Sequence, residues 1–192
     1  MQKRTAFVLF ACTLGLFSCK TAEFGYKVID VNGMIYDFSN RPIPNYKIFL
    51  GEKYSSTTDI NGRFLISKVP AGDYIIHGEG GGYESYQSAV VIYQREQIIY
   101  IRLPSFKQLL ELADTALAKN QINEADAYLV RAGLLGEETT ELLFYRATVR
   151  FRQKRYIEAL NILQTAVNSG STDMYVREFL NDLKRMQDEN KF

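Results

Sequence analysis

The 192-residue chain has few of the side chains that carry catalysis or bind metals. It contains one histidine, His77, two cysteines and no tryptophan. A catalytic or metal-binding histidine needs partners, and no second histidine is present to pair with it. The 23 lysine and arginine residues nearly balance the 22 acidic ones, so the net charge of +1 indicates no basic surface for nucleic acid. The sequence therefore predicts a protein that is not an enzyme and holds no metal and no cofactor.

Both cysteines lie in an N-terminal segment that has the pattern of a secretion signal. Lys3 and Arg4 precede an apolar run over residues 6–17, which is shorter than the roughly 20 residues needed to span a bilayer. The run leads into a Leu-Phe-Ser-Cys motif that ends at Cys19. This motif resembles a bacterial lipobox, although its phenylalanine is bulkier than usual. The alternative is an ordinary signal peptide with a chance cysteine.

The lipobox resemblance implies that residues 1–18 are a signal peptide and that Cys19 becomes the lipidated first residue of the mature chain. Cys12 would leave with the signal, so no thiol would remain for a disulfide, a metal or nucleophilic catalysis. Residues 19–26 would form a short linker to the membrane. We therefore expect a lipid-anchored protein of the bacterial cell envelope that faces the periplasm or the cell surface.

Residues 27–103 have the pattern of a small β-sandwich. Strand-forming residues alternate with turn clusters rich in glycine, proline, asparagine and aspartate. Short strands at this spacing predict a seven-stranded β-sandwich. We expect the strands near residues 27–36, 46–50, 53–58, 62–67, 73–79, 88–93 and 97–103.

Several short motifs in this half together resemble the carboxypeptidase regulatory-like family, a prealbumin-like β-sandwich. The similarity covers about residues 28–103 and rests on the combination, because each motif alone is weak. The motifs are the segments 33–37, 41–44, 58–64, 70–74 and 82–83. The resemblance implies a domain that occurs as an appendage in zinc carboxypeptidases.

One stretch of this half could be mistaken for a calcium site. Asp59 opens an Asp-x-Asn-Gly motif, but the oxygen ligands needed at the fifth and twelfth positions of a calcium loop are missing. Asn61 and Gly62 both tolerate a positive φ, so a hairpin turn is the better interpretation. We expect residues 70–72 to fold a second hairpin.

His77 and the glycine-rich run 78–82 have equally plain interpretations. His77 lies in an alternating strand pattern and lacks the zinc-binding His-x-x-Glu spacing of the carboxypeptidases. The glycine run has no Lys-Ser or Lys-Thr of a phosphate-binding loop and opens no helix. We expect His77 to be an ordinary strand residue and the glycines to form a bulge or wide turn before Tyr83.

Residues 105–192 have a helical pattern. Pro104 cannot continue a strand ladder, and Ser105 with Gln108 has the pattern of a capping box at a helix start. No Gly/Ser linker separates the two halves, so we expect them to abut. The fold class predicted for the whole chain is therefore α+β with two domains.

The helical half contains an internal repeat whose period is that of tetratricopeptide repeats. The half resembles two such repeats, at about 105–138 and 139–170, followed by a capping helix over 172–189. Arg146 and Glu137 depart from the usual pattern. A plain helical bundle is the alternative. The matching pairs, all at the same offset, are Leu109/Leu143, Ala113/Ala147, Ala125/Ala159, Leu129/Leu163 and Ala132/Ala166.

The register of these repeats places a largely apolar face on the first helix of each hairpin. Such a face is typical of a protein or peptide site if it is exposed. The β-domain or the final helix could instead fill it. The predicted partner-binding residues are Leu110, Asp114, Leu117, Phe144, Thr148, Phe151 and Arg152.

Two hypotheses for function remain at this point. The first is a non-catalytic envelope lipoprotein whose helical half acts as a protein-interaction scaffold or assembly accessory, with another envelope protein or peptide as partner. The second is a carbohydrate-binding envelope protein that uses aromatic side chains of the sandwich to stack on a glycan. The aromatic candidates are Tyr83, Tyr86, Tyr93 and Tyr100.

Overall fold

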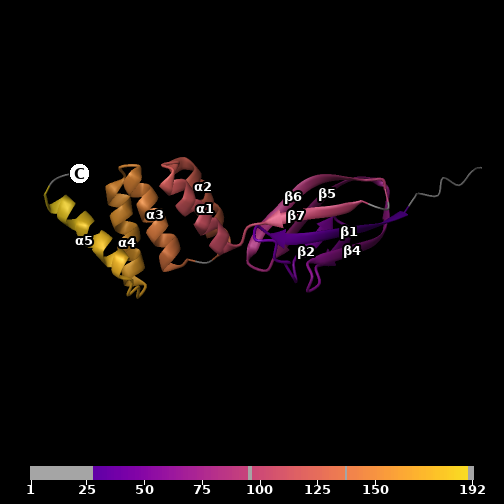
Figure 1. Ribbon diagram of the computed structural model, residues 1–192, viewed down its shortest axis with the longest axis horizontal. Helices are drawn as coiled ribbons and strands as arrows, with labels where there is room; N and C mark the ends of the chain where they lie inside the picture. Colours follow the sequence, from indigo (N-terminus) through magenta and orange to yellow (C-terminus); the bar gives the residue numbers. More distant parts are fainter. Residues whose placement is uncertain (1–27, 95–96, 137, 190–192) are drawn as a thin grey trace, which may run out of the picture.

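The computed structural model describes residues 28–94, 97–136 and 138–189. Seven strands form a β-sandwich, and five helices follow in an array placed end to end with it (Figure 1). The predicted α+β fold class is thereby confirmed. The predicted signal peptide 1–18, Cys19 and the linker 19–26 lie outside the described residues. None of the helices described is long and apolar enough to cross a bilayer.

The sandwich consists of a three-stranded sheet in the order β4-β1-β7 and a four-stranded sheet in the order β3-β2-β5-β6. All pairings are antiparallel except that of β1 with β7, which is parallel. The strands are β1 (Val28–Asp37), β2 (Lys47–Leu50), β3 (Tyr54–Thr57), β4 (Arg63–Pro70), β5 (Gly72–Gly80), β6 (Tyr83–Ile92) and β7 (Ile98–Leu103).

The sandwich core follows from the two-residue period of the strands. In β1, Ile29, Val31 and Ile35 turn inward and are almost wholly buried. Ile48 and Ile76 of the opposite sheet pack against the same core. Alternating apolar residues on both inner faces thus explain why the sequence pattern located the strands well.

The two predicted hairpin turns are wrong in one respect, because each joins strands of different sheets. β3 and β4 flank Asn61-Gly62 but belong to separate sheets, as do β4 and β5 around residues 70–72. The carboxylate Oδ1 of Asp59 accepts hydrogen bonds from the amides of Asn61 and Arg63, at 2.8 Å each. This local turn reverses the chain, and the amide of Ile35 then binds the Gly62 carbonyl at 2.8 Å. After this turn, β4 therefore pairs with β1 and not with β3.

The glycine run behaves as the sequence predicts. The register between β5 and β6 shifts at a bulge between Gly78 and Gly80. Gly80, Gly81 and Gly82 all have positive φ, at 120°, 67° and 72°. β6 begins at Tyr83, earlier than the expected start at residue 88, because it pairs with β5 directly after this turn.

The helices form two antiparallel hairpins and a final helix. The second hairpin repeats the first at a constant offset, since Phe106 and Thr140 open α1 and α3 and Ile122 and Tyr156 open α2 and α4. The repeat positions identified from the sequence are all buried. The helices are α1 (Phe106–Ala118), α2 (Ile122–Gly133), α3 (Thr140–Arg152), α4 (Tyr156–Asn168) and α5 (Met174–Asp188).

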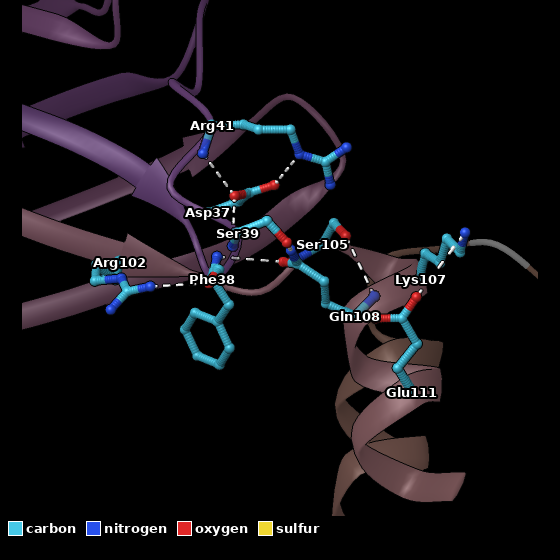
Figure 2. A network of polar contacts seen from close by, with 9 residues as sticks. All are labelled: Asp37, Phe38, Ser39, Arg41, Arg102, Ser105, Lys107, Gln108 and Glu111. Atoms are coloured by element: carbon cyan, nitrogen blue, oxygen red, sulfur yellow. Dashed lines mark hydrogen bonds and ion pairs between the residues drawn. The ribbon is translucent and has the colours of Figure 1, made fainter. Parts of the chain in front are cut away.

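Gln108 connects the two halves at the start of α1 (Figure 2). Its side-chain Oε1 accepts a hydrogen bond from the Ser105 amide at 3.0 Å, which completes the predicted capping box. The same atom accepts from the Phe38 amide at 3.4 Å, and Nε2 donates to the Ser39 hydroxyl at 2.9 Å. The cap of α1 is therefore also a contact with the sandwich.

A second contact joins α2 to β6. The Arg131 guanidinium donates to both carboxylate oxygens of Glu84, at 2.7 Å each. Such a bidentate pair has a defined geometry and so constrains orientation. The halves abut, as the missing linker predicts.

Candidate functional site

The first helices of the two hairpins, α1 and α3, enclose a pocket of about 270 Å³. Five of the seven predicted partner-binding residues line it, and their role in binding stays a prediction. Those five are Asp114, Leu117, Phe144, Thr148 and Arg152. Ala118 and Tyr145 complete the lining.

Leu110 and Phe151, the other two predicted residues, lie elsewhere. Leu110 is only 1% exposed because it packs into the core between α1 and its neighbouring helices, so its expected exposure is wrong. Phe151 is half-buried against Phe179 of α5 and Tyr156 of α4, with ring centroids 5.4 Å away in each case.

A second pocket, of about 390 Å³, lies between α3 and the start of α5. Phe144 and Tyr145 line both pockets, so the two adjoin across these rings. We call the two together the helical groove. The second pocket is completed by Thr140, Glu141, Asp173, Tyr175 and Val176.

The final helix fills only part of this face. Phe179 of α5 packs edge to face on Phe144, with the ring centroids 6.1 Å apart. The side chain of Asp173 caps α5 by accepting from the amides of Tyr175 and Val176. No residue of the sandwich, as far as the structure describes it, lines either pocket of the helical groove.

The centre of the helical groove lies in a negative field. Burial raises the pKa of Tyr145 above its usual value, and the nearby carboxylates of Asp114 and Glu141 raise it further. Like charge disfavours the ionised phenol, so Tyr145 stays protonated and its hydroxyl remains a donor. Arg152 contributes the positive charge at the α1–α3 pocket.

The comparison with family models concerns the sandwich. Residues 30–102 match the model of the carboxypeptidase regulatory-like domain. The predicted domain is confirmed. The match covers less than half of the chain and does not extend to the helices.

Solved structures with similar folds are distant. A mutant type II cohesin–X-dockerin complex from Acetivibrio cellulolyticus is 24% identical, with a TM-score of 0.34; the match covers 39% of this chain and 56% of that one. A protein from Bacteroides uniformis, described as a proposed carbohydrate-binding protein, is 12% identical, with a TM-score of 0.35; the match covers 41% of this chain and 42% of that one. A comparison with curated protein sequences finds no significant match.

The tyrosines proposed for glycan stacking do not share one face of the carboxypeptidase regulatory-like domain. Tyr83 and Tyr86 are partly buried against the core. Tyr93 is 52% exposed after β6, whereas Tyr100 is 65% exposed on β7 of the other sheet. A role for them in glycan binding stays a prediction.

The chemically suggestive residues of the same domain take structural positions. His77 stacks on Phe49 of the neighbouring strand, with ring centroids 4.8 Å apart. Asp59 uses its carboxylate in the turn described above. Among the residues that the structure describes, no three histidine, cysteine, aspartate or glutamate side chains lie together as a possible metal site.

Sequence reasoning missed a pocket of about 390 Å³ at the junction of the two halves. Gly80, Gly81 and Gly82 line it on the sandwich side, and Arg131 and Leu134 line it on the helical side. Leu134 is 81% exposed. No local pattern indicates this pocket, because it forms only where segments far apart in the sequence meet.

Proposed function

We propose that this protein is a non-catalytic lipoprotein of the bacterial cell envelope, tethered by lipid on Cys19, whose helical half binds a segment of another envelope protein. The observation that carries the proposal is the helical groove. Its two adjoining pockets expose apolar and charged side chains, and five residues predicted from the repeat register line one of them. Such grooves are suited to short segments of a partner.

The proposal identifies the four helices α1 to α4 as two tetratricopeptide repeats. The constant offset between the hairpins and the buried alanines at the crossings of each hairpin support this. In such a repeat array the first helices of successive hairpins form one continuous face, here α1 and α3. α5 would be the capping helix that closes the array.

The fold would present the helical groove away from the membrane. β1 starts at Val28, a short distance along the chain from Cys19, and ends at Asp37, beside the contact between Phe38 and Gln108. A strand of this length rises about 33 Å. The tethered end of the sandwich and the helices therefore lie at opposite ends of β1.

Photo-crosslinking in cells tests this function. A crosslinking amino acid at Thr148, inside the groove, should capture a discrete envelope protein. Thr165 of α4 is the matched control, because each hydroxyl donates to a carbonyl four residues earlier but only Thr148 lines the helical groove. Equal capture from both positions, or none from Thr148, would contradict the proposal.

The tether has a separate test. Replacing Cys19 by serine should move the protein from the membrane fraction to the soluble fraction, since acyl chains contribute about 0.8 kcal/mol per buried CH₂. Continued association of Cys19→Ser with the membrane would rule out lipid as the main anchor. The groove could still bind its partner in that case.

A further inference from the structure

The helical groove has an apolar interior and a charged rim. Leu117 and Val176 are buried beneath its two pockets, and the rings of Phe144 and Tyr145 lie between them. An occupant therefore needs at least one apolar side chain to gain from desolvation. Apolarity alone does not select a partner, and the charges on the rim provide that selection.

The rim is mainly acidic. Asp114, Glu141 and Asp173 line the two pockets, against Arg152 as the basic lining residue. Within the described part of the chain, no lysine or arginine forms an ion pair with these three carboxylates.

Several carboxylates elsewhere on the helices form ion pairs within the chain. Asp126 pairs with Arg150 at 2.8 Å, and Glu158 pairs with Arg155 at 2.6 Å. Arg152 is the single basic residue among the lining residues of the two pockets, so the groove keeps a net negative charge that a cationic ligand would complement. Two of the carboxylates, those of Asp114 and Glu141, act on the same phenol of Tyr145 and so lie on either side of the wall that the pockets share.

We propose that the helical groove binds an extended peptide segment in which a lysine or arginine adjoins an aliphatic residue. The aliphatic side chain enters the α1–α3 pocket over Leu117 and Phe144. The cation lies at the shared wall, within reach of Asp114 and Glu141. The inference rests on the proposed function and adds the chemistry of the partner to it. It disfavours acidic segments, since three carboxylates would repel them.

Selection from a display library of short random peptides tests this inference. The bait is the full chain carrying Cys19→Ser. The wild-type groove should enrich peptides with a lysine or arginine next to leucine, isoleucine or valine. Enrichment of acidic peptides, enrichment without a charge preference, or no enrichment would each overturn the inference.

Matched variants test whether the preference for cationic peptides arises in the helical groove. Asp114→Asn and Glu141→Gln should each weaken an enriched peptide about five- to tenfold in fluorescence anisotropy, as expected for one charge-assisted contact. Glu111→Gln on α1 removes the same charge outside the groove, where Glu111 faces Lys107 at 3.9 Å, and should leave affinity unchanged. Equal losses in all three variants would mean a general charge effect and contradict the site.

The two proposals can fail separately. Capture of a partner from Thr148 together with no preference for cationic peptides would preserve the binding function and reject the inferred chemistry. A cationic preference that persists in Asp114→Asn and Glu141→Gln would place that preference outside the groove and reject the inference.

Discussion

At the scale of single residues, buried polar groups are satisfied by specific partners. Asp37 at the end of β1 is wholly buried, and its carboxylate accepts from the amides of Ser39 and Arg41 and from the Arg41 side chain, all within 2.9 Å. Burial alone would raise the pKa of this carboxyl, but the hydrogen bonds from Arg41 and Ser39 outweigh it and hold the pKa below its usual value. The charged form therefore stabilises the fold.

Asp37→Asn should lower the free energy of unfolding at pH 7 by about 1–3 kcal/mol, because charge-assisted hydrogen bonds are lost. A lowered pKa contributes stability that is fully present above the unfolded value of about 4 and is lost as the pH falls through the folded value. The difference from wild type should therefore shrink below pH about 4 in urea denaturation. Asp73→Asn, at an exposed position on β5, is the control, and a difference that does not depend on pH would contradict this role.

Gly62 occupies a position where the backbone conformation and a close neighbour both favour glycine. Its φ is +72°, and an added Cβ would lie 2.4 Å from the carbonyl oxygen of Ile35. Gly136 has a similar φ of +82° but open space around it. Thermal unfolding should show a larger loss of stability for Gly62→Ala than for Gly136→Ala, which carries only the cost of about 1 kcal/mol for the left-handed conformation. Equal losses would mean that the close approach has no effect.

At the scale of elements, small residues determine how the helices cross. Ala125 of α2 and Ala159 of α4 are fully buried at equivalent positions of the two repeats. At these positions the second helix of each hairpin packs against the first. A longer side chain there would force the helices apart. This close packing explains why alanine recurs at the same position of each repeat.

Ala125→Leu should reduce stability by about 1–3 kcal/mol through overpacking. Ala127→Leu adds the same atoms to the same helix at a position outside the buried core and should have an effect within about 0.5 kcal/mol of zero. Chemical denaturation of the two variants measures the difference. Similar values for both would argue against a tight crossing at Ala125.

The sequence predicted the elements better than their pairing. Hydrophobic periods of two and of 3.6 residues are local signals, and they located all seven strands and both helical hairpins. The sheet that receives a strand is decided by distant partners. The turn at Asn61-Gly62 has the same local chemistry in a hairpin and in a connection between sheets. The pairing of β4 with β1, next to the hydrogen bond from Ile35 to Gly62, distinguishes the two cases.

The candidate site was predictable in part for the same reason. Repeat register places Asp114 and Thr148 on one face of successive first helices, and the structure brings them to one pocket. Leu110 lies on the same helix as Asp114, one turn earlier, but neighbouring helices cover it. The second pocket depends on how α5 docks, which no repeat pattern specifies.

At the scale of the whole molecule, polar contacts join the two halves. Gln108 binds Phe38 and Ser39, and Arg131 binds Glu84 (Figure 2 shows the first of these contacts). Such contacts are directional, so they constrain the orientation of the two halves as well as adding stability. The array in Figure 1 would then hold the helical groove at a constant angle to the sandwich.

Combining Gln108→Ala with Arg131→Ala should broaden the distance distribution between spin labels on Ser55 of β3 and Asn168 of α4, measured in a chain with Cys12→Ser and Cys19→Ser. Arg177→Ala on α5, far from the junction, should leave the distribution unchanged. An equally narrow distribution in the double variant would show that other contacts hold the halves together.

The central claim is that the helical groove is the surface through which this protein binds its partner. The most direct measurement is the affinity of the partner captured from Thr148 for two purified variants, Thr148→Arg and Thr165→Arg. Both substitutions replace a helical threonine whose hydroxyl donates to a carbonyl one turn earlier, but only the first fills a pocket of the groove. We expect at least a tenfold loss of affinity for Thr148→Arg and none for Thr165→Arg. Unchanged affinity for Thr148→Arg in a folded protein would contradict binding in the helical groove.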